Sequence, residues 1–387
     1  MPIDYLKLKQ EITNLGNEAR AREAVMQSAL KAMREQLNSH ATDLIALQKL
    51  VEEEAAKSKG LRCAVPLSEP LNAHIPCALP APPCTILAAD GSQINPDPHD
   101  TVLYGLINIG VFRMQPGSGL VPQEITHNTL IHGDQLYAGG ATLSEDLVAL
   151  LRDVQERKML AELAKDETAP VISLTDGPIE LYHEPRQEQK FKVYFEQYLS
   201  ALAELALHDV ITAGYVSRPR ADLVVKLLSL PDLETSGDVK GIPAGLTDIA
   251  LFSTLLAPGE RSAVFRLQSR SAADYKDRTA LHFFYLNAGT TQQPAFARVE
   301  IPQWVVENPR SIELLHAALV EQARNNPAAP YPYPLLRAHE IAVVRLPERQ
   351  QVTSMIEAEL LRQGFPPAVK SQKQVNKEYS GKRRMGR

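Results

Sequence analysis

The first sixty residues carry a helical pattern of apolar positions. The chain from Tyr5 to Lys59 contains no internal proline. Apolar residues recur there at alternating steps of three and four, with one additional step of four, at Ile12, Leu15, Ala19, Met26, Ala29, Met33, Leu37, Leu44, Leu47 and Val51. Such heptads are typical of coiled coils. We therefore expect a long, coiled-coil-like helix over residues 1–60, whose apolar seam is covered by a partner helix or by the body of the protein.

The pattern changes at residue 61. Residues 61–84 contain too many prolines for a helix or a central strand, so we interpret them as a proline-rich linker or extended arm. Beyond them, apolar strands and amphipathic helices follow one another as far as residue 365. Strands are expected near residues 86–89, 102–114, 170–177, 209–216, 262–267, 281–288 and 295–305, and helices near 143–164, 187–208, 221–230, 311–325 and 349–363.

This order of elements predicts the fold class. Strands come first and then alternate with helices, which is typical of a mixed α/β sheet flanked by helices. We expect one domain over residues 85–365. The last segment, residues 366–387, is rich in Lys and Arg, and we expect a basic, disordered tail. The alternative is a contact between this tail and a phosphate backbone or a partner.

Composition narrows the class of protein further. Hydrophobic residues make up 44% of the 387 residues and charged residues 22%, which is ordinary for a globular protein. The net charge of -5 excludes a wholly basic nucleic-acid coat. No apolar run approaches the roughly 20 residues that a bilayer requires, and the charged N-terminus lacks a signal core. We therefore expect a cytoplasmic protein that does not contact a membrane.

Two aspartates follow apolar strands and are the first candidates for chemistry. Asp90 ends the run "ILAAD" and Asp176 ends "VISLTD", and each precedes a glycine. If the two strands are neighbours in one sheet, their carboxylates converge at a spacing of about 4.8 Å. Converging carboxylates repel one another unless a cation neutralises them. Mg2+ and Mn2+ prefer oxygen ligands, and two such ions can promote hydrolysis of a phosphodiester.

A third carboxylate is expected from the helix that precedes Asp176. Glu156 and Glu162 both lie on it, and their separation of six residues places them on different faces. Glu156 shares a face with Leu160 and Leu163, which would turn it toward the sheet. We prefer Glu156, and Glu162 remains the alternative.

A histidine and a tyrosine near the C-terminus complete the candidate site. His339 follows the segment "YPYPLLRA" and can exchange a proton near neutral pH or bind a metal. Tyr331, eight residues earlier, can contact a phosphate or stack on a base. The predicted catalytic residues are thus Asp90, Glu156, Asp176, His339 and Tyr331, and the first four are also the predicted metal ligands.

Four motifs in order resemble those of the NurA nucleases. They are "ILAADGSQ" around Asp90, "VISLTDGP" around Asp176, "AGYVSRPR" at residues 213–220 and "YPYPLLRAH" ending at His339. The resemblance covers roughly residues 80–350. It implies a ribonuclease H-like core and a homodimer. It places Asp90 and Asp176 at the family's metal-binding aspartates, and His339 and Tyr331 at its C-terminal histidine and tyrosine.

The resemblance also implies an activity and partners. The family's nucleases use Mn2+, or Mg2+, and degrade DNA as 5' to 3' exonucleases and single-strand endonucleases, with two ions expected per site. They act in DNA end resection and repair beside a hexameric HerA-type ATPase. This chain has no GxxxxGK[ST] motif, so movement along DNA would need such a separate motor. The alternative function is a non-catalytic adaptor that retains the fold and binds DNA or the ATPase without cutting.

Overall fold

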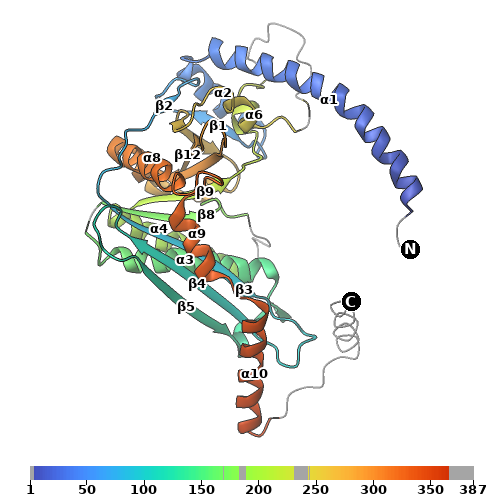
Figure 1. Cartoon of the computed structure of the whole chain (residues 1–387), viewed down its shortest axis with the longest axis vertical. Helices are drawn as coiled ribbons and strands as arrows, with labels where there is room; N and C mark the ends of the chain where they lie inside the picture. Colours follow the sequence, from blue (N-terminus) through green and yellow to red (C-terminus); the bar gives the residue numbers. More distant parts are fainter. Residues whose placement is uncertain (1–3, 169, 183–188, 231–242, 244, 366–387) are drawn as a thin grey trace. The chain divides into compact units, whose positions relative to one another are not determined.

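The computed structural model describes residues 4–168, 170–182, 189–230, 243 and 245–365. Over these residues, eleven strands are hydrogen-bonded into a mixed sheet, helices flank the strands, and a long helix stands at the N-terminal end (Figure 1). The predicted fold class is therefore confirmed. None of the helices in the described ranges combines the length and the apolar character needed to cross a membrane.

The chain divides into two compact units. Unit 1 consists of Met1–Pro82, Gly177–Glu180 and Ala213–Pro332, and unit 2 of Pro83–Asp176, Leu181–Thr212 and Tyr333–Arg387. The chain first crosses from unit 1 to unit 2 between Pro82 and Pro83, close to the boundary expected at residue 84. The region 85–365, expected to be one domain, is shared between both units. Residues 366–387, the expected tail, lie outside the described residues.

Unit 1 combines the N-terminal helices with one group of strands. Its strands are ordered β1-β11-β12-β13-β9, and β12 and β13 are buried over almost their whole length. Its elements are α1 (Tyr5–Ser39), α2 (Leu44–Lys57), β1 (Cys63–Pro66), β2 (Ile75–Pro76), most of β9 (Ile211–Ser217), α5 (Leu223–Leu227), α6 (Asp248–Phe252), β10 (Glu260–Arg261), β11 (Phe265–Gln268), the short 3-10 helices Ala272–Asp274 and Asp277–Thr279, β12 (Leu281–Asn287), β13 (Phe296–Pro302), α7 (Gln303–Val306) and α8 (Pro309–Ala323).

The expected long N-terminal helix is present, but it does not continue to residue 60. The helix ends at Ser39, and α2 begins five residues later, after a turn in which the Ala41 carbonyl accepts a hydrogen bond from the Leu71 N–H at 2.9 Å. The turn follows the additional step of the heptad pattern, from Met33 to Leu37, which still lies within α1. The seam is buried in its second half, as at Met33, but Ile12 is 58% exposed. Unit 1 itself therefore covers only the later part of the seam.

The interpretation of residues 61–84 as a linker is also wrong for their first part. Cys63–Pro66 form β1, which pairs antiparallel with β11, and Cys63 and Ala64 are completely buried. The strand ends at Pro66, which agrees with the rule that proline is tolerated only at the margins of a strand. Proline content thus marked the end of a short strand and not the absence of one.

Unit 1 contains a buried carboxylate that makes its stability depend on pH. Asp248 is fully buried, accepts hydrogen bonds from the N–H groups of Val224 and Val225, and accepts another from the Tyr285 hydroxyl at 2.5 Å. Burial outweighs these hydrogen bonds and raises the pKa of Asp248 to about 6. Its contribution to stability is therefore complete below the unfolded pKa of 3.8 and is lost as pH rises through about 6.

Replacing Asp248 by asparagine is expected to remove this pH dependence. The difference in free energy of unfolding between wild type and Asp248→Asn should grow by the order of 3 kcal/mol as pH falls from 7 to 4. Denaturant unfolding followed by fluorescence measures it, because the single tryptophan, Trp304, is buried in the same unit. A difference that stays constant over this pH range would contradict the prediction.

Unit 2 carries the other strands together with the helices α3, α4, α9 and α10. Its strands are ordered β8-β3-β4-β5, with β3 and β8 parallel and the other pairs antiparallel. Its elements are β3 (Thr85–Ile94), β4 (Gly105–Met114), β5 (Gln123–Ile131), the 3-10 helix Gly133–Leu136, β6 (Tyr137–Ala138), β7 (Ala141–Thr142), α3 (Glu145–Ala164), β8 (Val171–Asp176), α4 (Gln189–Leu207), the first residues of β9, α9 (Tyr333–Ala342) and α10 (Leu346–Arg362).

Local sequence signals explain several of these elements. The Ser144 hydroxyl accepts a hydrogen bond from the Leu147 N–H at 3.2 Å and so caps the N-terminus of α3. Strands β4 and β5 pair antiparallel and form a hairpin across the turn that follows Met114. Helix α3 contacts β3 and β4, α4 packs against α3, and α9 contacts β3 and β4 (Figure 1). The strands β3 and β4 therefore form the framework on which both α3 and α9 are positioned.

Candidate active site in unit 2

Strand β3 does not end at Asp90, as its sequence had indicated, but continues to Ile94. Its parallel pairing with β8 stops at Ala89 and Thr175, whereas its antiparallel pairing with β4 continues to the end of the strand. The side of β3 that faces β8 therefore loses its neighbour just where Asp90 begins. The change from buried to half-buried residues along β3 occurs at the same point.

The register brings the two predicted aspartates together. Ala89 pairs with Thr175, so Asp90 and Asp176 are the next residues on neighbouring parallel strands. Side chains at equivalent positions of paired strands point to the same face of a sheet. The expectation that the two strands are neighbours is confirmed, and Asp90 and Asp176 share one face at the end of the parallel ladder.

Helix α9 supplies the histidine on that face. The Nδ1 atom of His339 lies 2.7 Å from Oδ2 of Asp90, and the other carboxylate oxygen accepts the Gly91 N–H at 2.8 Å. The Asp90 side chain is 18% exposed and that of His339 is 59% exposed. The histidine ring thus orients Asp90 while much of it stays open to solvent and to a substrate.

Gly110 explains how α9 comes so close to the sheet. It is the β4 partner of Asp90, and a Cβ atom built on it would lie 2.6 Å from the backbone nitrogen of Ala342 and 2.7 Å from the carbonyl oxygen of Ala338. The Ala342 carbonyl also accepts hydrogen bonds from Ser92 Oγ at 2.5 Å and Asn108 Nδ2 at 2.7 Å. Direct contact between backbones and these two hydrogen bonds fix the position of α9.

Glu156 approaches the same place from the opposite face. A Cβ atom on Gly91 would point away from Asp90 and would lie 2.7 Å from Glu156 Oε1 and 2.6 Å from Arg152 Cγ. The absence of a side chain at residue 91 therefore makes room for α3 against β3. Thr175 also points to the α3 face, where its hydroxyl accepts a hydrogen bond from Arg157 Nη2 at 2.6 Å. Helices α3 and α9 thus cover opposite faces of β3.

The charges around Glu156 are crowded. Burial, followed by the negative charges of Asp153 and Asp90, raises the pKa of Glu156 well above its ordinary value. Arg152 opposes this shift, because its Nε lies 3.5 Å from Glu156 Oε1. Burial lowers the pKa of the Arg152 guanidinium, but the carboxylates of Asp153 and Glu156 outweigh this effect and raise it. A positive charge is therefore favourable beside Glu156.

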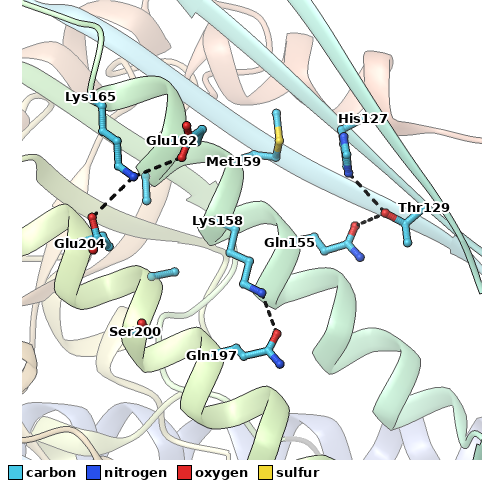
Figure 2. Close-up of a pocket in the computed structure, with 12 residues that line it drawn as sticks. His127, Thr129, Gln155, Lys158, Met159, Glu162, Lys165, Gln197, Ser200 and Glu204 are labelled. Atoms are coloured by element: carbon cyan, nitrogen blue, oxygen red, sulfur yellow. Dashed lines mark hydrogen bonds and ion pairs between the residues drawn. The ribbon is translucent and has the colours of Figure 1, made fainter. Parts of the chain in front are cut away.

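The two remaining predicted residues are Glu162 and Tyr331. The Glu162 side chain is 74% exposed and lines a groove of about 670 Å3 between α3, α4 and β5, where it pairs with Lys165 (Figure 2). Of the two helix glutamates, the structure places only Glu156 near Asp90. Tyr331 belongs to unit 1, where its ring lies edge-on to Tyr215 with centroids 5.5 Å apart. Its role in the site remains a prediction.

The donor atoms fit a hard divalent cation. Asp90, Asp176 and Glu156 offer carboxylate oxygens, the type of ligand that Mg2+ and Mn2+ prefer. Burial, together with repulsion from Asp153 and Asp90, raises the pKa of Glu156, and a cation nearby would favour its charged form. Within the described ranges, however, no three His, Cys, Asp or Glu side chains are arranged closely enough to count as a metal-binding group. The assignment of metal ligands therefore stays a prediction.

Two contributors to this arrangement were not identified from the sequence. Arg152 lies four residues before Glu156, so the pair had the spacing of neighbours on one helix face. Gly110 interrupts the apolar strand "LINIGVFRM", and a glycine inside a strand often marks a close backbone approach. Both signals were present, but neither indicates which helix lies opposite.

Comparisons with known proteins agree with this architecture. The NurA domain family matches residues 84–344, well over half of the chain. The crystal structure of the NurA nuclease from Sulfolobus solfataricus has a TM-score of 0.51 and 14% identity, covering 76% of this chain and 89% of that one. A crystal structure of NurA with manganese has a TM-score of 0.40 and 11% identity, covering 74% and 91%.

A more distant similarity is found with the catalytic domain of human endonuclease V. Its TM-score is 0.33 at 12% identity, with coverage of 81% of this chain and 98% of that chain. The search of curated proteins finds no match to this chain. At 14% identity, the S. solfataricus structure supports the fold alone. The match of the family over residues 84–344 shows that this chain belongs to the NurA domain family.

Proposed function

We propose that this protein is a divalent-metal-dependent deoxyribonuclease. The observation that carries the proposal is the position of Asp90 at the end of the β3–β8 ladder, between His339 on one face and Glu156 on the other. Membership of the NurA family and the similarity in fold to a NurA nuclease support the same chemistry. The proposed activities are 5' to 3' exonuclease and single-strand endonuclease activity.

The proposed metal ligands are Asp90, Asp176, Glu156 and His339. When bound, Mn2+ or Mg2+, with two ions expected, would polarise a phosphoryl oxygen and supply an activated water. The histidine contacts Asp90 through Nδ1, which leaves its other ring nitrogen, Nε2, either to bind the metal or to take up and release a proton. Arg152, close to Glu156, would offset the negative charge that a DNA phosphate brings to this site.

The proposed biological role is DNA end resection and repair together with a hexameric HerA-type ATPase. The chain has no Walker A motif, so translocation along DNA would come from that partner. We further propose a cytoplasmic homodimer, in which the exposed first half of the α1 seam is available for protein contacts. Tyr331 is proposed to contact the substrate.

The test of the proposed function is hydrolysis of end-labelled single-stranded DNA in the presence of Mn2+. The wild-type protein should release short labelled products from the 5' label and a ladder of shortening products from the 3' label. Chelation of the metal should stop both reactions. A wild-type protein that leaves both substrates intact, while still binding DNA, would instead be the non-catalytic adaptor.

Replacing Glu156 by glutamine is expected to lower the initial rate by at least about 100-fold. The replacement keeps the shape of the side chain but removes the carboxyl group that would bind the metal beside Asp90. The matched control is Glu162→Gln on the same helix, which alters an exposed ion pair with Lys165 and should retain a rate within about twofold of wild type. Equal rates for the two variants would contradict the assignment of Glu156.

A further inference from the structure

A polar pocket lies beside the candidate site along β3. It has a volume of about 660 Å3 and is lined by residues 93–98 and 344–346, Glu145 and Arg349. Gln93 follows Asp90 by three residues on the same strand, a distance of about 10 Å at about 3.3 Å per residue. Arg152 lies between the candidate site and the pocket: it is close to Glu156, and its Nη1 donates a hydrogen bond to Gln93 Oε1 at 3.4 Å. Gln93 lies on the α3 face of β3 and Asp90 on the α9 face, so a chain bound at Asp90 would pass the edge of β3 that β8 leaves open to reach this pocket within a few nucleotides.

The walls of the pocket are held by contacts between the loop after β3 and α10. Arg349 Nη2 donates to Asp100 Oδ2 at 2.9 Å, and the hydroxyl groups of Tyr104 and Thr353 lie 2.9 Å apart. Beneath them, an apolar cluster joins Ile94, Tyr104 and Leu106 to Val344, Val352 and Ile356. The pocket is therefore supported by packing and by hydrogen bonds on both sides.

The lining groups match a nucleotide better than a simple anion. The side-chain amides of Gln93 and Asn95 orient each other, since Gln93 Nε2 donates to Asn95 Oδ1 at 2.7 Å and Gln93 Oε1 accepts from Arg152. Asn95 Nδ2 is left as a hydrogen-bond donor to the edge of a nucleobase. Arg345 is exposed at the rim and can bind a phosphate. Two of the nearby carboxylates are engaged, since Asp97 Oδ1 accepts the His99 N–H at 2.9 Å and Asp100 pairs with Arg349, and Glu145 also lines the pocket.

We propose that this pocket is a subsite for one nucleotide of a single-stranded DNA chain, a few positions from the phosphate that is cut. The base lies against Gln93 and Asn95, and its phosphate contacts Arg345. A base within a duplex is paired and stacked, so only an unpaired strand can place one there. The inference rests on the proposed function and specifies its substrate as a strand that is unpaired next to the cleavage site.

Binding of a fluorescently labelled single-stranded oligonucleotide tests the subsite. Measurements of anisotropy in the presence of EDTA separate binding from cleavage. Arg345→Ala should weaken binding roughly tenfold and reduce the salt dependence of log Kd by about one. Asn95→Ala should weaken binding several-fold with an unchanged salt dependence, because it removes an uncharged contact. A double-stranded oligonucleotide without free ends should show neither effect.

The matched control is Arg362→Ala. It removes the same charge from the other end of α10, about 25 Å from Arg345 along the helix axis. The affinity of Arg362→Ala for the single-stranded oligonucleotide should equal that of the wild-type protein. The subsite is overturned if Arg345→Ala and Asn95→Ala bind like wild type, or if Arg362→Ala weakens binding as much as Arg345→Ala does.

A second measurement separates the subsite from the proposed function. Bis(p-nitrophenyl) phosphate is a phosphodiester too small to extend from Asp90 to the pocket, and its hydrolysis by the wild-type protein with Mn2+ reports on the catalytic centre alone. If the wild type cuts neither this compound nor DNA, the nuclease proposal fails. The expected loss of affinity in Arg345→Ala and Asn95→Ala would still support the subsite, as a DNA-binding site of an adaptor.

Discussion

Asp90→Asn is expected to lower DNA hydrolysis by about 1,000-fold or more, because several kcal/mol of transition-state stabilisation depend on this carboxylate. The replacement keeps the size of the side chain and the hydrogen bond from the Gly91 N–H, but removes the charge that faces His339. It also removes a negative charge that acts on Glu156. The thermal unfolding temperature should therefore stay the same or rise slightly, whereas activity is lost.

Rates on labelled single-stranded DNA with Mn2+, together with thermal unfolding curves, check this expectation. Asp134→Asn is the matched control, since Asp134 is exposed in the same unit and lies in a short 3-10 helix away from β3. Its rate should equal that of wild type. If Asp90→Asn remained as active as Asp134→Asn, the catalytic centre would have to be sought elsewhere in the chain.

Gly110→Ala is expected to damage both stability and activity. The new methyl group would lie 2.6–2.8 Å from Ala342 N, Ala338 O and Ile341 Cβ, and two of these atoms belong to the backbone of α9. Removing these close contacts requires α9 to shift, which should lower the free energy of unfolding by about 3 kcal/mol. His339 follows Ala338 directly, and a displacement of about 1 Å is enough to reduce a rate about 100-fold.

Gly105→Ala on the same strand is the control for Gly110→Ala. A methyl group there would lie 3.3 Å from the side chain of Ile131, which can adjust by a few tenths of an ångström. The cost should stay below about 1 kcal/mol, and the rate should be close to that of wild type. Urea unfolding and initial rates measure both variants. Equal stability of the two variants would refute the direct contact between α9 and β4.

Much of the fold was predictable because its signals are local. The Ser144 cap, the apolar spacing of α3 and the hairpin of β4 with β5 each depend on residues close in sequence, and the structure contains all three. The predictions failed where a distant contact intervenes. The N-terminal helix ends near Ala41, whose carbonyl accepts a hydrogen bond from Leu71, and Cys63–Pro66 become a strand because β11 offers a partner.

The sequence by itself determined which residues have suitable chemistry: two aspartates after apolar strands, two glutamates on one helix, and a histidine near the C-terminus. Only the tertiary structure decided how they meet. Asp90 and His339 are 249 residues apart, and Gly110 allows the helix of one to reach the strand of the other. The choice between Glu156 and Glu162 likewise depends on which face of α3 contacts β3. Residue type and periodicity are properties of short stretches of sequence. Strand register and side-chain packing, in contrast, depend on interactions across the whole chain.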